Sequence, residues 1–189
     1  MNKNITLTEL ARSNEIYIDS TAIQSNGFQE LMIQTARFLK NEGNTIKVHR
    51  VVLNEFEKQE DSNNIKERQC SEERLNMLKA LEEGGVIQYI GNSLESRCVE
   101  QLYLDLIVTH RNKKNLTVIS NNYDLVHDVL LINQLISFSG KEVTTFRITD
   151  EGDLVQVSTQ GISKHSDNLI TATEDTTLQT SKLLKMFGL

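Results

Sequence analysis

The fold is decided by the stretch Glu15-Ile-Tyr-Ile-Asp19, a short run of β-forming residues that ends at an acid. Its length and composition predict a buried strand. Similar stretches follow at residues 45–49, 86–90, 116–120 and 143–148, with helical patterns of apolar residues between them. Strands that alternate with helices favour a parallel sheet with helices on both faces. The sequence therefore predicts an α/β fold, a three-layer α/β/α sandwich with a central, mostly parallel sheet of about five strands.

The expected helices follow from caps, stops and apolar spacing. Thr6-Leu-Thr-Glu9 has the spacing of a capping box and predicts a short first helix. Ser71, followed by two glutamates, is the expected N-cap of a helix that ends at Gly84-Gly85. After the fifth strand, a turn and a further short strand predict a hairpin. The remaining helices are expected over 28–41, from Val51 into the polar residues 57–69, over 94–109 and over 123–137, and the hairpin strand over 154–157.

Composition and charge exclude several classes of protein. The chain has 189 residues with 20 Lys and Arg against 26 Asp and Glu, a formal net charge of -6. A coat protein or a histone-like DNA binder needs a basic field instead. The apolar stretches fall short of the ~20 residues that cross a bilayer, and the polar start of the chain lacks the apolar run of a signal peptide. We therefore expect a soluble, cytoplasmic protein with no membrane partner.

The acidity is unevenly distributed along the chain. Residues 1–149 contain 20 acids and 17 bases, whereas residues 150–189 contain 6 acids and 3 bases, so each part has a charge of -3. We expect an α/β domain over 1–157, then a polar connector and a short apolar segment over 158–189. That segment either packs on its own domain or docks on a partner or a second subunit.

Four acids lie near the ends of predicted strands. Asp19 ends the first strand, Glu55 lies one turn into the helix after the second, Asp105 lies in the helix before the fourth, and Asp124 follows the fourth. Ligands bind outside the carboxyl ends of the strands of an open parallel sheet. Carboxylates gathered there repel one another unless cations neutralise them. Mg²⁺ or Mn²⁺ suits such hard oxygen ligands, and a pair of ions can promote hydrolysis of a phosphodiester.

Each acid also has an ordinary structural interpretation. Asp19 and Asp124 are suitable helix N-caps, and Glu55 is suitable as a solvated helix residue. Asp105 stands in an apolar stretch, and burial of an unpaired carboxylate there would be costly. Its ordinary place is therefore the solvent-exposed face of its helix. The functional hypothesis depends on the four acids as a set.

The order of these motifs resembles the PIN-domain nucleases. The residues that carry the resemblance are Ile18-Asp19-Ser-Thr-Ala-Ile23, Val48-His-Arg-Val-Val-Leu-Asn-Glu55, Asp105-Leu-Ile and Thr117-Val-Ile-Ser-Asn-Asn-Tyr-Asp-Leu125. The resemblance covers about residues 14–150. It implies an α/β/α sandwich, acids that bind divalent metal, and cleavage of single-stranded RNA.

The fourth motif departs from the family pattern. Asn122 stands where the family has an Asp, and Asp124 occupies the place of a second Asp. Asn keeps an oxygen ligand but loses a charge, so a second ion should bind more weakly. Asp124 substitutes for the missing acid, or one metal suffices, or the site only binds. The resemblance also implies that Ser120 orients a carboxylate or a water.

Two groups of basic residues are candidates for holding phosphates, because contacts to the backbone position a nucleic acid. Lys47 and Arg50, with His49 between them in the chain, flank the expected site, and Arg111, Lys113 and Lys114 form the densest cluster. For the second cluster, solubility and the helix dipole are sufficient explanations.

The leading hypothesis is a metal-dependent endoribonuclease that cleaves single-stranded RNA, with DNA as the other substrate. Asp19, Glu55, Asp105 and Asp124 would be catalytic and would hold Mg²⁺ or Mn²⁺ together with Asn122. The alternative is a PIN-like module that binds RNA or a protein without cleavage. A second copy of the chain, forming a homodimer, or an inhibitor protein is a partner compatible with both hypotheses.

Overall fold

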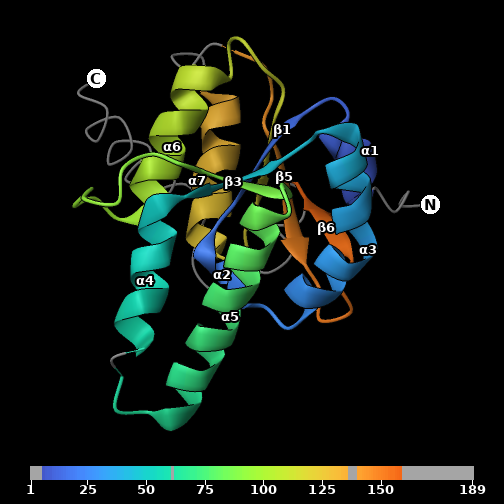
Figure 1. Ribbon diagram of the computed structural model, residues 1–189. Helices are drawn as coiled ribbons and strands as arrows, with labels where there is room; N and C mark the ends of the chain where they lie inside the picture. The colour runs from blue at the N-terminus through green and yellow to red at the C-terminus, as the bar shows by residue number, and fades with distance from the viewer. Residues whose placement is uncertain (1–5, 61, 136–139, 159–189) are drawn as a thin grey trace, which may run out of the picture.

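The structure is a computed structural model that describes residues 6–60, 62–135 and 140–158 (Figure 1). In this part of the chain six strands form one sheet in the order β3-β2-β1-β4-β5-β6. Strands β1 to β5 pair in parallel, and β6 pairs antiparallel to β5 as the predicted hairpin partner. The strands are β1 (Glu15–Ile18), β2 (Ile46–His49), β3 (Ile87–Ile90), β4 (Leu116–Ile119), β5 (Thr144–Ile148) and β6 (Leu154–Val157).

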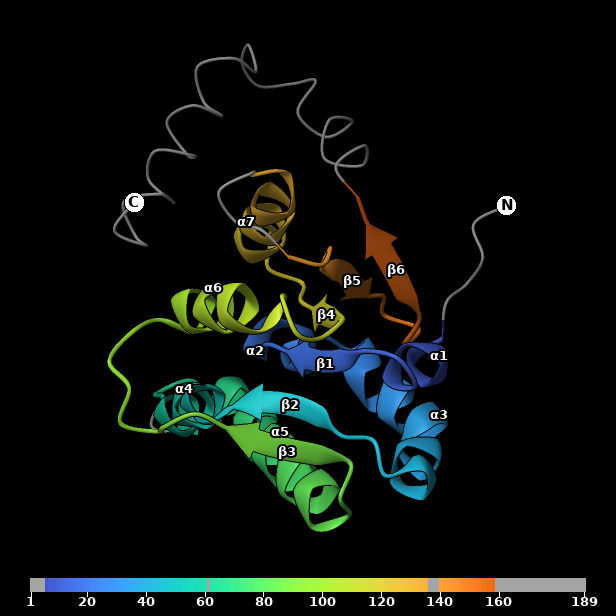
Figure 2. The ribbon, with the colours of Figure 1, turned by 90° about the horizontal axis from the view of Figure 1, so that it is seen from above.

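Helices cover both faces of the sheet. Figure 1 views the sheet close to edge-on, with α6 and α7 on one side of the strands and α3 and α5 on the other. Figure 2 shows the strands in order from β3 to β6. The expectation of an α/β fold with a mostly parallel sheet is confirmed, with six strands in place of about five. The helices are α1 (Leu7–Ala11), α2 (Ser20–Gln24), α3 (Gly27–Glu42), α4 (Arg50–Glu60), α5 (Ile65–Glu83), α6 (Val99–His110) and α7 (Tyr123–Gln134).

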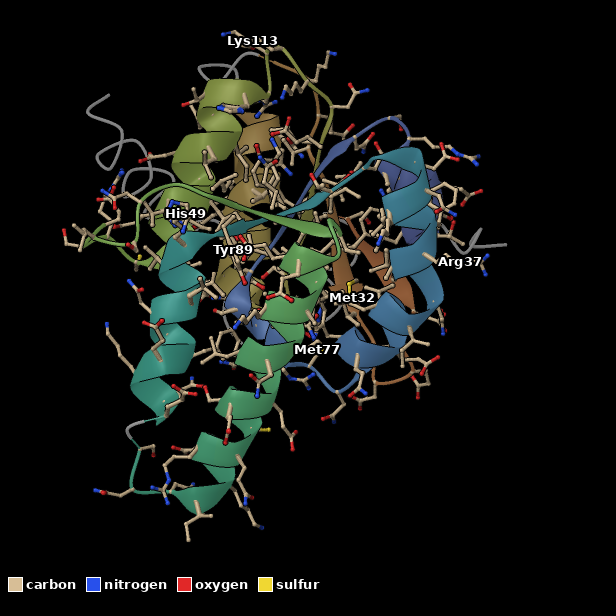
Figure 3. The ribbon with its side chains drawn as sticks, in the orientation of Figure 1. Met32, Arg37, His49, Met77, Tyr89 and Lys113 are labelled. Atoms are coloured by element: carbon tan, nitrogen blue, oxygen red, sulfur yellow. The ribbon has the colours of Figure 1, made fainter. Side chains whose placement is uncertain are left out.

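The core lies between the sheet and the two helical layers. Strand β4 is buried at all four positions, as a central strand covered on both faces should be. Tyr17 of β1 meets Tyr103 of α6 edge to face, with ring centroids 6.2 Å apart. On the other face, Met32 of α3 and Met77 of α5 lie in the region between their helices and belong to the core or pack against it (Figure 3).

Two predicted helix starts are wrong. The helix expected from residue 94 begins at Val99, because Cys98 is extended, and Leu94 is 88% exposed. Ser71 is no N-cap: it lies inside α5, where its hydroxyl donates to the Phe56 carbonyl oxygen (2.7 Å) and ties α5 to α4. The N-cap of α5 is Asn64, whose side chain accepts from the Lys66 amide.

Helices α4 and α5 form a pair that extends beyond the sheet (Figure 1).

None of the described helices combines the length and apolar character needed to cross a membrane. The capping box at Thr6 and Glu9 is confirmed at the start of α1. The predicted connector and apolar segment after residue 158 lie outside the described residues.

Candidate metal centre

Asp19 is a buried carboxylate at the carboxyl end of the central strand β1. The parallel register pairs Ile18 with Ile119, so Asp19 and Ser120 come next on adjacent strands. The Ser120 hydroxyl donates to Asp19 Oδ2 (2.6 Å), and the Thr21 hydroxyl lies 2.9 Å from both carboxylate oxygens. Asp19 Oδ1 also accepts from the Ala22 amide (2.9 Å) and caps α2. Asp19 therefore has its ordinary capping role and also a fixed orientation at the sheet edge.

Two further carboxylates approach Asp19 from separate helices. Glu55 comes from α4, is half-buried and accepts a hydrogen bond from Ser20. Glu100 comes from the first turn of α6 and accepts from the Asn122 side-chain amide at 2.9 Å. The charge of Glu100 acts on both Asp19 and Glu55. Three segments distant in sequence thus bring three carboxylates to the same edge.

The electrostatics of this cluster oppose its ionisation. Burial raises the pKa of Asp19 to about 6, and Glu100 adds to the effect, although hydrogen bonds from Ser120, Ala22 and Thr21 lower it. Burial also raises the pKa of Glu55, with a further contribution from Glu100 and opposition from Ser20 and Lys58. No Lys or Arg in the described part forms an ion pair with any of the three carboxylates. The negative charge is therefore poorly compensated by the protein itself.

Tyr103 fixes the framework beneath the cluster. Its hydroxyl donates to the Ile18 carbonyl oxygen and accepts from the His49 amide (3.2 Å). It thereby joins the carboxyl ends of β1 and β2, from which Asp19 and the helix of Glu55 follow. Burial raises the pKa of Tyr103 well above its usual range, and the nearby charges of Asp19 and Glu55 add to this.

Asn122 positions Glu100 and caps α7. Its side-chain oxygen accepts from the Asp124 and Leu125 amides (2.9 and 3.3 Å), while its side-chain nitrogen donates to Glu100. Its backbone amide donates to the Ser120 hydroxyl (3.0 Å), which in turn donates to Asp19. Because the oxygen of Asn122 is engaged in the cap, this residue acts here as a positioning group, in contrast to the predicted metal ligand.

Two of the predicted acids are not brought into the cluster. The Asp105 side chain is 40% exposed and pairs with Arg97, a contact that sequence reasoning did not anticipate. Asp124 is exposed in the first turn of α7 and makes no side-chain hydrogen bond to Asp19, Glu55 or Glu100. Glu100, which was not predicted, thus interacts with Asp19 and Glu55, whereas Asp105 is paired with Arg97 and Asp124 is exposed to solvent.

The direction of α6 explains why Glu100 was missed. This helix precedes β4 and runs opposite to it, so its first turn lies at the carboxyl edge of the sheet. Asp105 lies five residues later, which at 1.5 Å per residue is about 7.5 Å towards the other edge and about 140° round the helix. A search for acids in the first turn of the helix before the fourth strand would have found Glu100. Because the predicted helix began near residue 94, that signal was lost.

Four of the five predicted phosphate-binding cations lie away from the cluster. The exception is Arg50, which begins α4 directly after β2, at the carboxyl edge, and lies over the Tyr89 ring at 5.9 Å. Arg111 is buried and donates to the Ile132 carbonyl oxygen (3.0 Å), so it ties α6 to α7 and is inaccessible to a substrate. Lys47, Lys113 and Lys114 lie before or within the start of strands, at the amino edge of the sheet.

The donor chemistry of Asp19, Glu55 and Glu100 suits a hard divalent cation, because all three supply carboxylate oxygens. As the side chains stand, no three His, Cys, Asp or Glu residues of the described segments are close enough together to hold a metal ion. Closure around an ion would therefore require side-chain movement, most simply of Glu100 and Glu55, which are only half-buried.

We compared the chain with known families and characterised proteins: no family model matches it, and no curated protein matches it.

Proposed function

We propose that this protein is a metal-dependent nuclease of the PIN type, an endoribonuclease that hydrolyses phosphodiester bonds of single-stranded RNA. The observation that carries the proposal is the convergence of Asp19, Glu55 and Glu100 at the carboxyl edge of the sheet, with Asp19 only 2% exposed. A buried acid with a raised pKa beside other acids is costly for stability, which favours a functional reason for keeping it.

Asp19, Glu55 and Glu100 would hold Mg²⁺ or Mn²⁺. When bound, such an ion supplies positive charge for the phosphate oxygens and lowers the pKa of water. The protein groups prepare the site: Ser120 and Thr21 fix the two oxygens of Asp19, and Asn122 holds Glu100. Without a cation, the same three carboxylates would repel an anionic phosphodiester, so cleavage should depend strictly on added metal.

Metal binding should also depend on pH. Asp19 binds a proton with a pKa of about 6, and a carboxylate must lose its proton before it can coordinate a cation. Affinity for Mn²⁺ should therefore fall as the pH decreases below about 6. Isothermal titration with Mn²⁺ at pH 5 and pH 8 would measure this difference.

The decisive experiment compares two acids of the same helix. Purified wild type, Asp19→Asn, Glu100→Gln and Asp105→Asn are incubated with fluorescent single-stranded RNA and Mn²⁺ or Mg²⁺. We expect cleavage to fall at least about a hundredfold in Asp19→Asn and Glu100→Gln, because an electrostatic group at the reacting centre is worth about that much. Asp105→Asn, the matched control, should cleave like the wild type because Asp105 is paired with Arg97.

The outcomes distinguish the site from its surroundings. Equal cleavage by wild type and Asp19→Asn would identify a contaminating nuclease and refute the proposal. Loss of activity in Asp105→Asn with retention in Glu100→Gln would reject the role of Glu100. Duplex RNA and single-stranded DNA, tested under the same conditions, would establish the substrate class.

A second candidate function is a module that binds RNA or a protein without cleavage. The observation in its favour is that Asn122, which stands where the resemblance to PIN nucleases expects an Asp, uses its oxygen to cap α7. This alternative predicts RNA binding without cleavage in either metal. It also predicts that Mn²⁺ gives no binding heat and no protection against thermal unfolding.

A further inference from the structure

A second polar site lies at the opposite edge of the sheet from the acids. The segments that precede β1, β2, β4 and β5 line an open surface cavity of about 470 Å³. Figure 3 shows Lys113, one of the lining residues, beyond the end of α6 and away from His49, where β2 ends. The lining includes five basic side chains and one acid: Arg12, Lys47, Lys113, Lys114, Lys141 and Glu15.

The charge of this cavity contrasts with that of the chain. Five basic side chains and one carboxylate line it, a formal net charge of +4, whereas the chain as a whole has -6. A group of like charges brought together by four separate backbone segments is unfavourable unless an anion compensates it. The cavity therefore contains three of the predicted phosphate-binding cations, Lys47, Lys113 and Lys114, at the edge of the sheet opposite the acids.

Glu15 organises two of these cations. Its side chain is only 9% exposed and accepts from the ammonium groups of Lys47 and Lys114 and from the Tyr17 hydroxyl (2.6 Å). An ammonium group has three N–H donors, so each lysine keeps donors for a ligand after its bond to Glu15. The carboxylate thus holds two ammonium groups in a fixed arrangement at one wall of the cavity.

The other cations are available to a ligand. Lys113 and Lys141 are exposed and form no ion pair or hydrogen bond through their ammonium groups with any described residue. Arg12 is exposed, with its guanidinium 5.1 Å from the centre of the Phe38 ring. Since a guanidinium can bind an oxyanion with two parallel hydrogen bonds, Arg12 adds a second kind of anion ligand.

We propose that this cavity binds an anion that carries two or more phosphate groups. A phosphate monoester has about -1.5 to -2 charges at pH 7, and each phosphate of a nucleic-acid backbone has one. About two phosphates of the first kind or about four of the second therefore match the +4 of the lining. The volume falls within the range of about 300–1,000 Å³ typical of ligand sites. The phosphates belong either to a free polyphosphate or nucleotide or to the backbone of a nucleic acid. The site lies apart from the acidic cluster and does not rest on nuclease activity.

The test uses the full chain and a charge-matched control. Lys113→Gln/Lys141→Gln removes two unpaired cations of the cavity, and Lys66→Gln/Lys79→Gln removes two exposed lysines of α5. Binding of sodium triphosphate is measured by isothermal titration calorimetry in EDTA, with circular dichroism to verify folding. We expect the cavity variant to weaken triphosphate affinity at least about tenfold, which is about 1.4 kcal/mol, because it loses two charged hydrogen-bond donors. The α5 variant should bind like the wild type.

A single-stranded RNA oligonucleotide, measured in the same buffer, identifies the source of the phosphates. Loss of both RNA and triphosphate affinity in the cavity variant would assign the site to a nucleic-acid backbone, and loss of triphosphate affinity alone to a free polyphosphate or nucleotide. No triphosphate binding by the wild type, or equal weakening in the two variants, would overturn the proposal. Because EDTA prevents metal-dependent cleavage, neither result depends on whether the acids form a nuclease centre.

Discussion

Replacement of Asp19 by Asn should stabilise the protein at neutral and alkaline pH. The pKa of Asp19 rises from 3.8 to about 6 because the carboxylate is buried beside Glu100. At about 1.36 kcal/mol per pKa unit, the ionised form costs the folded state about 3 kcal/mol at pH 8. Asn fits the same space and keeps the acceptor for the Ala22 amide. We allow about 1 kcal/mol for a weaker hydrogen bond to Ser120 or Thr21, which leaves an expected gain of about 2 kcal/mol.

The pH dependence follows from the direction of the shift. A raised carboxyl pKa means that the folded state holds the proton more tightly, so the contribution of Asp19 is favourable below pH 3.8 and is lost as the pH rises through about 6. The gain in Asp19→Asn should therefore be fully present at pH 8. It should disappear by about pH 4.5, where Asp19 is mostly protonated in the folded state.

The assay is urea unfolding in EDTA, followed by circular dichroism at pH 4.5, 6 and 8. Asp105→Asn is the matched control and should change the free energy of unfolding by less than about 0.5 kcal/mol, because its pair with Arg97 is exposed. An Asp19→Asn protein less stable than wild type at pH 8 would refute the reasoning. So would a difference between the two proteins that is the same at every pH.

Three further changes test other parts of the structure. Although burial alone would raise the pKa of Glu15, hydrogen bonds from two lysines and Tyr17 lower it to about 2. Glu15→Gln should therefore lower the free energy of unfolding by about 1 kcal/mol at pH 7, after allowance for solvent screening. This loss should shrink as the pH falls from 4.5 through about 2, and a urea series that shows no such convergence contradicts it. Tyr103→Phe leaves the Ile18 carbonyl and the His49 amide without their hydrogen-bond partner. The variant should lose about 2 kcal/mol of stability, measured by thermal unfolding. An unchanged melting temperature would show that the hydroxyl does not contribute to stability. Asn122→Asp replaces the donor to Glu100 with a fourth acid, so the variant should lose about 1 kcal/mol of stability in EDTA. Its melting temperature should nevertheless rise more with Mn²⁺ than that of the wild type. A smaller rise would show that Asn122 does not limit metal binding.

The strands were predictable because each is a short run of β-forming residues between helical patterns. Such runs are local signals, and the observed strand bounds differ little from the predicted ones. The starts of α5, after its N-cap Asn64, and of α6, at Val99, were harder to predict. Capping depends on backbone geometry, and Ser71 was chemically as suitable a cap as Asn64. Ser71 is instead engaged with the Phe56 carbonyl of a neighbouring helix, a tertiary contact with no signature in sequence.

For the candidate site, the sequence alone determined that Asp19 and Ser120 would stand at the ends of β1 and β4, because each directly follows an apolar strand. The tertiary structure decided which other acids join them. Glu100 and Asp105 are both acids of one helix, and only the start and direction of α6 bring Glu100 to the carboxyl edge and leave Asp105 with Arg97. The same holds for the cations: strand polarity places Lys47, Lys113 and Lys114 at the amino edge. Residue types and strand order are properties of the chain, whereas the edge that a side chain reaches depends on how the segments pack.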